Sequence, residues 1–438
     1  MPMSAKFGTQ LLPRLDKIAA KFGTPFHIYD EQGIVDAVKG MYSAFADHGM
    51  AGFRNYFSVK ANPNPELMKI IVEAAGQESG FDCSSMPELS LSRRFVSGDR
   101  IMFSSNNTSS AEFAAALDQG GCILNIDDIT MLDRLSQAEL QGAAAVSFRY
   151  NPGSERSGDS IIGQPEEAKY GLRKDQLPAA YQRLLDLGVK RESIGIHTMI
   201  ISNQREKSYM METVKMMLDI AGEFLFRHQL KFRFINIGGG IGIPYRTNDS
   251  PFELYGFSCS AGQELRNFQE KFGYQPKLFM ECGRFVTGPH GVLVTSVLNR
   301  MSKHKEYVGV DACMSSLMRP AMYDAYHHIT VLGKGEDSPR ETVDVVGSLC
   351  ENNDKFAKNR HLPKTTLNDI LIIHDTGAHG HAMGFNYNGR VRPKELLLKP
   401  NGSVVLIRRA ETEEDYFRTL SFEPMTWSEQ PTRESEAA

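Results

Sequence analysis

Lys60 is the residue whose position raises a chemical question. The run Tyr56–Val59 reads as the end of a strand and delivers this lysine directly before Ala-Asn-Pro-Asn-Pro. A lysine ammonium is strongly hydrated, so at the end of a buried strand it either extends to the surface or serves as a nucleophile. The segment alone leaves both interpretations open.

Several other segments that read as strands also end in a chemically capable group. Parallel strands of a barrel present their carboxyl ends at one face, where the active sites of barrels lie. Any single member is readily explained as a polar loop residue, whereas the whole set favours a common site. The groups are Lys60, Asp82, Arg149, His197, the run Gly238–Gly240 and Glu281.

The motif INIGGGIGIPY follows an apolar strand and contains Gly238, Gly239 and Gly240. Without Cβ atoms, backbone N–H groups can approach a phosphate closely, and barrels often place such a site after their late strands. The glycine spacing is a poor match to a dinucleotide-binding motif. Taken alone, the glycines are explained equally well by a tight turn.

The motif MECGRF places Glu281 and Arg284 after another strand. A buried carboxylate can hold a ring nitrogen protonated, and an arginine can bind a phosphate or carboxylate with two N–H groups; a structural ion pair is the alternative. A strand-end lysine, a glycine cradle and a strand-end glutamate are together what pyridoxal phosphate requires, namely an amine, an anion site and a pyridinium partner. The three motifs therefore predict pyridoxal 5'-phosphate as the cofactor.

The elements that must position these residues follow two patterns. Up to about residue 290, short apolar runs alternate with segments of helical period, and roughly eight such units favour an α/β (β/α)8 TIM-like barrel over an open sheet. We assign this pyridoxal-phosphate-binding barrel to residues 25–290. Strands then follow one another without long helices, which predicts a C-terminal, mainly antiparallel β domain over residues 291–425. Residues 1–24 are a candidate for packing on that second domain.

The candidate strands before residue 290 are short apolar runs. They are FHIYD, RNYFSV, GFDCSS, RIMFSS, GCILNI, AAVSFRY, SIGIHTMI, FRFINIG and KLFMECG. Among the helical segments between them is DITMLDRLSQAE, residues 128–139, which we expect to form one helix.

Composition excludes some classes of function. The formal net charge of −4 and the pI near 6.3 argue against nucleic acid or an anionic membrane as the main partner. The six cysteines are scattered without metal-ligand spacing, which favours reduced thiols and no metal site. The N-terminal segment lacks the apolar run of a signal peptide, so we expect a cytoplasmic enzyme acting on a small molecule.

Further segments extend the pattern over nearly the whole chain. They resemble the fold type III, alanine-racemase-like pyridoxal phosphate decarboxylases, and most of all the diaminopimelate decarboxylases, with ornithine decarboxylases as more distant relatives. The segments are TPFHIYD, YFSVKANPNP, GFDCSSMPEL, RYNPG, KYGL, NIGGGIGIPY, ECGRFVTGPHG, VGVDACMSSLMRPAMYDAYHHI, VGSLCENND and DTGAHGHAMGFNYNGRVRP.

The resemblance implies roles around the cofactor. Lys60 is similar to the lysine that forms the Schiff base, and Asp82 to an aspartate beside the cofactor. Gly238–Gly240 and Arg284 resemble the phosphate contacts. Glu281 resembles the partner of the pyridine nitrogen.

The resemblance also implies roles toward the substrate. Cys350 resembles a cysteine that the second subunit of a homodimer contributes, to protonate the α-carbon after CO2 leaves. Arg319, Tyr323 and Glu351 match positions that recognise the far end of the substrate, and Arg284 is a further candidate contact. Arg319 suits a distal carboxylate and Glu351 a distal ammonium, although interface salt bridges are the alternative.

The segment GIHTMIISNQ departs from the family pattern His-Ile-Gly-Ser. In the family that histidine stacks over the cofactor ring. Here Met199 or Ile200 falls at or near its position, and His197 lies slightly earlier. Ser202 is expected to keep a phosphate contact, and a methionine thioether can cover an aromatic ring.

The segment DTGAHGHA is a second departure, because the family has a tyrosine where this chain has His379. That tyrosine normally reaches the cofactor phosphate and the substrate. An imidazole is shorter and titrates near neutrality. Both departures concern the substrate pocket, so a paralogue with altered substrate use is an open alternative.

The expected function is a carboxy-lyase that converts meso-diaminopimelate to L-lysine and CO2 in lysine biosynthesis. One alternative is a decarboxylase of D-ornithine, D-lysine or an amino-acid conjugate in a specialised pathway. A non-catalytic pyridoxal phosphate carrier would also keep Lys60 and the glycines, but it would have no use for SLCENND. A racemase would usually require a tyrosine base from the second domain.

Overall fold

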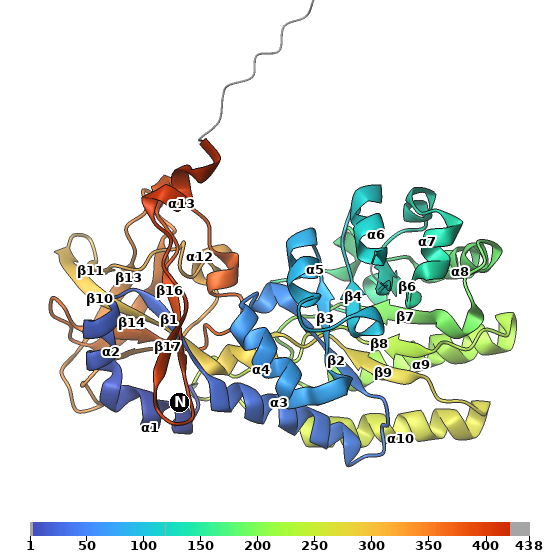
Figure 1. Ribbon diagram of the computed structural model, residues 1–438. Helices are drawn as coiled ribbons and strands as arrows, with labels where there is room; N and C mark the ends of the chain where they lie inside the picture. The colour runs from blue at the N-terminus through green and yellow to red at the C-terminus, as the bar shows by residue number, and fades with distance from the viewer. Residues whose placement is uncertain (1–2, 119, 421–438) are drawn as a thin grey trace, which may run out of the picture.

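The computed structural model describes residues 3–118 and 120–420, which fold into a closed barrel and a separate sheet domain (Figure 1). The barrel is built from the middle of the chain, and the sheet domain from both ends of it. This architecture confirms the predicted fold class. No helix among the described residues is long and apolar enough to cross a membrane.

Eight parallel strands close the barrel in chain order. Their side chains are almost entirely buried on both faces, as expected where helices cover a parallel sheet. Inside, Tyr56, Met102, Ile123, Phe234 and Phe279 pack into a separate cluster, so the lumen is filled and is not a pore. The strands are β2 (Arg54–Ser58), β3 (Gly80–Cys83), β4 (Ile101–Phe103), β5 (Ile123–Ile126), β6 (Ala145–Tyr150), β7 (Ile194–Thr198), β8 (Phe234–Asn236) and β9 (Lys277–Met280).

The barrel helices begin at local capping signals. Asn64 accepts from the Glu66 N–H at the start of α4, and Pro65 occupies its first position. Ser109 and Glu112 form a capping box at α6. The helices are α3 (Glu31–Ala46), α4 (Pro65–Ala75), α5 (Met86–Ser92), α6 (Ser110–Leu117), α7 (Gln137–Gly142), α8 (Leu177–Asp186), α9 (Lys207–His228) and α10 (Leu254–Phe272).

The segment predicted as one helix over residues 128–139 is instead two elements. A 3-10 turn covers Ile129–Arg134, and α7 begins only at Gln137. Ser136 caps α7 through a capping box with Glu139, and this local signal starts a new helix where a continuation was expected.

The sheet domain is a nine-stranded sheet in which antiparallel pairs predominate. Among the strands that the structure describes in this domain, only β1 with β16 and β11 with β13 pair in parallel. Apolar side chains form two further cores in this domain. The elements are α1 (Ala5–Leu11), α2 (Leu15–Phe22), β1 (Phe26–Asp30), α11 (Arg284–Thr287), β10 (Gly291–Ser302), β11 (Glu306–Val310), α12 (Arg319–Tyr323), β12 (Ile329–Val331), β13 (Arg340–Val346), β14 (Lys355–Pro363), β15 (Ile370–Ile373), β16 (Lys394–Leu398), β17 (Val404–Arg408) and α13 (Glu413–Phe417), with α11 at the junction to the barrel.

The strand predicted from FHIYD forms, but it does not belong to the barrel. β1 pairs with β10 and β16 in the sheet domain, so the barrel range predicted to begin at residue 25 is wrong at its start. A five-residue buried run is the same signal in either sheet, and only the pairing separates them. The final five residues of the range predicted for the β domain, 421–425, lie outside the described residues.

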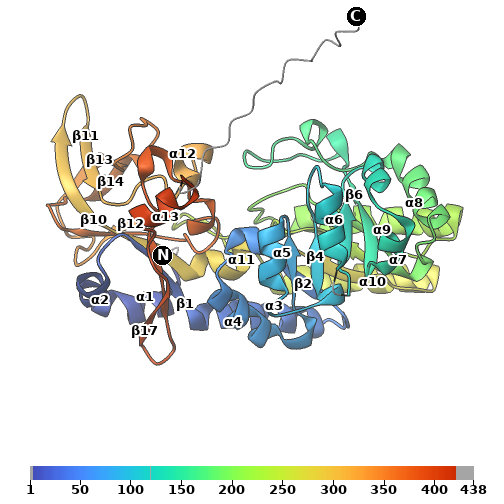
Figure 2. The same cartoon turned by 45° about the horizontal axis from the view of Figure 1, so that its top comes forward.

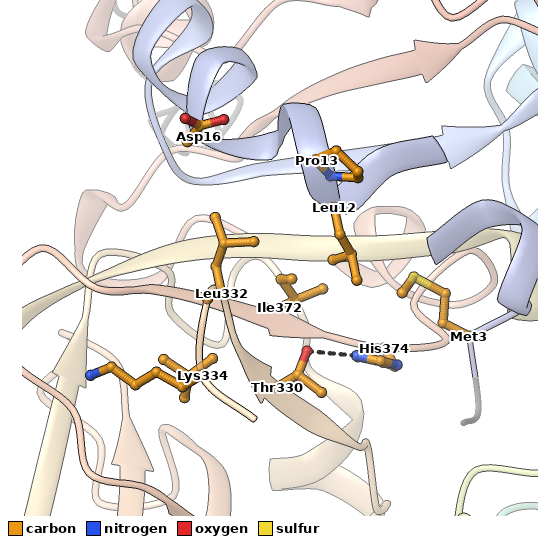
Figure 3. A pocket seen from close by; sticks show the side chains of 11 residues that line it. Met3, Leu12, Pro13, Asp16, Thr330, Leu332, Lys334, Ile372 and His374 are labelled. Atoms are coloured by element: carbon orange, nitrogen blue, oxygen red, sulfur yellow. Dashed lines mark hydrogen bonds between the residues drawn. The ribbon is translucent and has the colours of Figure 1, made fainter. Parts of the chain in front are cut away.

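The N-terminal helices pack on the sheet domain (Figure 1). Phe7, Leu11 and Leu15 share a core with side chains of β1, β10 and β16. A cavity of about 640 Å³ remains between these helices and strands β12 and β15; Figure 3 shows Leu12, Leu332 and other side chains that line it. Within it, Thr330 Oγ1 and His374 Nε2 lie 3.0 Å apart.

The two domains meet at the turn that carries Lys60. Asn62 Nδ2 donates to Gly377 O at 3.0 Å, and His379 N donates to Ala61 O at 2.8 Å. Asn64 Nδ2 donates to the Glu395 carboxylate at 3.0 Å. The loop after β15 is therefore held against the end of barrel strand β2.

Candidate active site

A cavity of about 420 Å³ lies where the carboxyl ends of the barrel strands face the sheet domain. Its walls combine barrel loops with α12 and the loop after β15. It is lined by Lys60, Pro63, Glu88, Ile161, Ile162, Met199, Ser202, Arg284, Arg319, Tyr323, His379, Ala382 and Met383. Many of the residues predicted from sequence therefore share one cavity.

Lys60 lies in a 3-10 turn, Val59–Ala61, directly after β2. Its neighbours Val59 and Ala61 are buried, whereas Lys60 itself is exposed and lines the cavity. Gly283 allows this turn to pack closely, because a Cβ there would lie 2.6 Å from Ala61 Cβ. The sequence leads the lysine out of a buried strand into the cavity and not toward the outer surface.

Glu281, directly after β9, is the centre of a buried polar cluster. Its Oε1 accepts from Asn236 Nδ2 at 2.7 Å and from Asn125 Nδ2 at 3.4 Å. His197 Nε2 lies 3.2 Å from the same oxygen, an ion-pair distance without hydrogen-bond alignment. Burial alone would raise the pKa of Glu281, but the His197 ring, the Asn236 amide and the Lys60 ammonium outweigh it and lower that pKa.

The pKa of Asp82, on β3, is shifted in the opposite direction. Burial and the charge of Glu281 raise the pKa of Asp82 to about 7. The Ser58 hydroxyl lies between the two residues, 3.3 Å from Asp82 Oδ2 and 2.8 Å from Glu281 O. At neutral pH, Glu281 is thus the member of the pair that carries the charge, and Asp82 exchanges a proton near pH 7.

The glycine run after β8 packs too tightly for side chains. Gly238 and Gly240 have φ angles of 71° and 95°, in the left-handed region. A Cβ on Gly239 would lie 2.6 Å from Glu281 O, and one on Gly240 would lie 2.6 Å from Ile201 O. The bare backbone therefore lies against the end of β9 and the loop after β7.

Two guanidinium groups face the cavity around Tyr245. Arg284 donates to the Tyr245 hydroxyl at 2.6 Å and to Ser202 Oγ at 3.2 Å. Arg319 Nη1 lies 2.8 Å from His327 Nε2, and its Cζ lies 4.8 Å from the centre of the Tyr245 ring. Among the described residues these side-chain contacts include no carboxylate, so both cations are available to an anionic ligand.

Arg319 and Tyr323 reach the cavity from α12. Arg319 is only 3% exposed, and this burial lowers its pKa. His327 Nδ1 lies 2.8 Å from His374 O, which makes Nδ1 the donor and leaves Nε2 to accept from Arg319. The histidine thereby fixes the direction of the guanidinium.

His379, on the loop after β15, lines the cavity with φ of 56°. Burial and the positive charges of Arg284 and Arg319 lower the pKa of His379 well below its ordinary value. At neutral pH the ring is an uncharged imidazole. It can offer one donor and one acceptor to a ligand.

The structure distinguishes the two residues considered for the ring-stacking position. Met199 lines the cavity, and Gly239 N lies 3.2 Å from its sulfur. Ile200 is 4% exposed and does not line this cavity. His197 is buried against Glu281 and does not line the cavity, and Ser202 lies beside Arg284.

The cavity wall does not include several residues considered from sequence, namely Asp82, Arg149, His197, Gly238–Gly240, Glu281, Cys350 and Glu351. Cys350 is exposed in the loop between β13 and β14, and Glu351 follows it. The Cys350 N–H donates to Asn388 Oδ1 at 2.7 Å. Arg149 forms a nearly buried ion pair with Asp127 at 3.6 Å within the barrel.

Sequence reasoning missed several residues of the site. Asn236 stands two residues before Gly238, and Asn125 is the polar residue of the otherwise apolar run ILNI, so both carried a detectable signal. Tyr245 closes the motif INIGGGIGIPY but was not assigned a role. Ile161 and Ile162 come from a loop without a motif and had no signal.

Pyridoxal phosphate fits these residues. The cavity offers a solvent-accessible amine and two cations without carboxylate contacts. The glycine run lies against Met199 of the cavity wall, and Glu281, a buried carboxylate with lowered pKa, lies against the glycine run. These are the groups that would hold an aldehyde, a protonated ring nitrogen and a phosphate.

Comparison with known proteins decides the family. Residues 26–377 match the family described as pyridoxal-dependent decarboxylase, C-terminal sheet domain. The chain belongs to the pyridoxal-dependent decarboxylases. It is therefore a carboxy-lyase with pyridoxal phosphate as its cofactor, and the predictions of family, enzyme class and cofactor are confirmed.

Individual relatives extend the match over nearly the whole chain. Protein TabA of Pseudomonas amygdali pv. tabaci is 42% identical over 97% of this chain and 98% of its own. Diaminopimelate decarboxylase of Methanothermobacter thermautotrophicus is 35% identical over 92% of each chain. The crystal structure of diaminopimelate decarboxylase from M. jannaschii with L-lysine superposes with a TM-score of 0.80 at 28% identity, covering 93% of this chain and 94% of that one.

Proposed function

We propose that this decarboxylase acts on an α-amino acid with a second charged group at its far end, and that meso-diaminopimelate is its first candidate substrate. The observation that carries the proposal is Arg319, a buried guanidinium that lines the cavity and is oriented by His327. A buried cation of this kind suits a carboxylate, which it can bind through two N–H groups. The M. jannaschii relative, named a diaminopimelate decarboxylase and solved with L-lysine, supports the same class.

The residues that would hold the cofactor are those of the barrel end. Lys60 would carry it covalently, Glu281 would keep its ring nitrogen protonated, and Gly238–Gly240, Ser202 and Arg284 would bind its phosphate. When bound, pyridoxal phosphate supplies an electron sink for the pair left on the α-carbon as CO2 departs. Met199 would cover one ring face with a thioether, which has no proton to exchange.

After CO2 leaves, the substrate α-carbon must receive a proton, and the family resemblance implies a cysteine as its donor. We assign this role to Cys350 of a second copy, with Glu351 of that copy as a candidate partner of the substrate's distal ammonium. The exposure of Cys350 supports this role, because its thiol is accessible to a partner. The enzyme would then be a homodimer with shared sites.

A second candidate is decarboxylation of D-ornithine, D-lysine or a conjugated amino acid. The observation in its favour is that His379 and Met199 line the cavity where the family pattern has a tyrosine and a histidine. The relative named Protein TabA is also more similar than the diaminopimelate decarboxylase at 35% identity. Lysine biosynthesis and a cytoplasmic location stay predictions.

A panel of diamino acids, with release of CO2 as the measurement, tests the substrate. With meso-diaminopimelate as substrate, Arg319→Gln should raise KM by about 10- to 100-fold, the equivalent of one charge-assisted hydrogen bond. D-Lysine lacks the distal carboxylate, so its KM should change little in the same variant. Equal loss on both substrates, or no turnover of meso-diaminopimelate by the native enzyme, would reject this assignment.

A further inference from the structure

A second cavity, of about 340 Å³, lies at the junction of the two domains near α12. We call it the Tyr326 pocket. Helix α12 stands on the side of the sheet domain that faces the barrel (Figure 2), and the barrel contributes the loop that contains Arg246. The pocket is lined by Arg246, Pro320, Asp324, Ala325, Tyr326, Lys355, Phe356, Ala357, Lys358, Asn359 and Arg360.

The pocket holds an excess of positive charge. The Cζ atoms of Arg246 and Arg360 lie 4.0 Å and 4.1 Å from the centre of the Tyr326 ring. Lys358 is paired with Asp324 at 2.9 Å, and Lys355 with Asp344 at 3.3 Å. Among the described residues no carboxylate lies within ion-pair distance of either guanidinium.

Other arginines stacked on tyrosines in this chain are compensated. Arg156, over Tyr209, pairs with Glu212 at 2.6 Å. Arg149, over Tyr170, pairs with Asp127 at 3.6 Å. Such pairs need no ligand, because the carboxylate already neutralises the guanidinium.

The arrangement without carboxylates occurs at Tyr245, where Arg284 and Arg319 face the active-site cavity. Tyr326 repeats it in a separate cavity. Burial lowers the pKa of Arg360, Tyr326 opposes that shift, and the positive charge of Arg246 adds to it. An anion bound in the pocket would offset the positive charge of both guanidinium groups.

We propose that the Tyr326 pocket is a binding site for a small dianion, either a phosphate group or a dicarboxylate. Both present oxygens that two guanidinium groups can bind in the plane of their N–H bonds. The two side chains are already oriented by the tyrosine ring, so little conformational freedom is lost on binding. Nothing in this proposal depends on the identity of the substrate.

The pocket is connected to the active site by two contacts. Arg360 Nη1 donates to His327 O at 2.7 Å, and His327 Nε2 lies 2.8 Å from Arg319 Nη1. An anion that shifts Arg360 would act on the residue that orients Arg319. A change in substrate KM on binding would follow; this consequence alone rests on the proposed function.

Isothermal titration of the holoenzyme with inorganic phosphate, and separately with malonate, tests the site at constant ionic strength. We expect one anion per chain in addition to the cofactor. Arg246→Gln and Arg360→Gln should each weaken that binding by about tenfold or more. Arg156→Gln, which removes a stacked arginine that has its own carboxylate, is the matched control and should leave the affinity unchanged.

The active-site cavity is the competing location, and Arg319→Gln separates the two. Binding that persists in Arg319→Gln holoenzyme supports the Tyr326 pocket. Binding that is lost in Arg319→Gln but kept in Arg246→Gln and Arg360→Gln places the anion in the active site and overturns the proposal. If the native holoenzyme binds neither phosphate nor malonate, the proposal is overturned, and this result does not depend on whether any variant folds.

Discussion

The barrel end and the sheet domain contribute to the cavity in different ways. Lys60 and Glu281 follow adjacent barrel strands, and the hydrogen-bond ladder of the barrel fixes their positions. Arg319 and His379 come from a helix and a loop that reach the cavity only because the second domain is docked on it. Under the proposed function, cofactor chemistry would belong to the barrel end, and substrate discrimination would belong to the docked elements of the sheet domain.

The largest effect is expected when the lysine at the barrel end is removed, because this change tests the contribution of the barrel to the site. Lys60→Ala should abolish turnover and covalent attachment of the cofactor, because no other amine lines the cavity among the described residues. Borohydride reduction followed by peptide mapping measures the attachment. Lys69→Ala, at an exposed position of helix α4, is the control and should behave like the native enzyme. A pyridoxyl label on another lysine of the native chain would contradict the assignment.

The next effect tests whether the sheet domain acts in a second copy of the chain. Cys350→Ala alone should lower kcat by roughly 10²- to 10⁴-fold, the contribution of a positioned proton donor. Mixing it with Lys60→Ala should restore about a quarter of native activity, since half of randomly formed dimers are mixed and each mixed dimer has one intact site. Activity after dissociation and reassociation is the measurement. No recovery from the mixture would show that the site is not shared.

A smaller effect distinguishes the two carboxylates within the barrel. Glu281→Gln should lower kcat by about 10- to 100-fold, because the ring nitrogen loses a charged partner. Asp82, with a pKa of about 7, is mostly protonated below that pH, so Asp82→Asn should match the native rate there. The two rates should diverge as the pH rises above 7 and the native Asp82 ionises. Steady-state rates between pH 6 and 9 provide the check, and equal losses at low pH would refute the distinction.

The smallest expected effect is on the free energy of unfolding, whose dependence on pH should differ between the sheet domain and the barrel. Burial and the charge of His381 lower the pKa of His27, on β1, to about 4. A lowered histidine pKa contributes stability that is complete above about pH 6.5 and is lost as the pH falls toward 4, on the order of 3 kcal/mol. His328 and His374, also in the sheet domain, have pKa values of about 4 and about 3.

Acidification should therefore loosen the sheet domain before the barrel. Hydrogen exchange followed for peptides of each domain between pH 7 and 4 measures this order. His27→Gln can keep contacts to Thr376 and Ser316 without taking up a proton, and it should flatten the pH dependence of exchange. Earlier loosening of the barrel, or an unchanged slope in the variant, would contradict the expectation.

Much of the fold was predictable from sequence because its signals are local. Eight apolar runs between residues 54 and 280 correspond to the eight barrel strands. FHIYD gave the same signal but pairs in the other sheet. Strand β14 gives a weak local signal, because KFAKNRHLP carries charged residues and alternates poorly; its pairing with β13 holds it in the sheet.

The sequence by itself determined the kinds of chemistry available: a lysine after a strand, a glycine run, a strand-end glutamate and an arginine pair, each visible in its own segment. Only the tertiary structure decided that Met199 and not Ile200 faces the cavity, that Asp82 and Glu281 share one buried setting, and that Arg246 and Arg360 meet at Tyr326. The physical reason is distance along the chain. Residue type and local propensity are properties of a short segment, whereas burial, charge coupling and pocket shape arise when barrel closure and domain docking bring remote segments together.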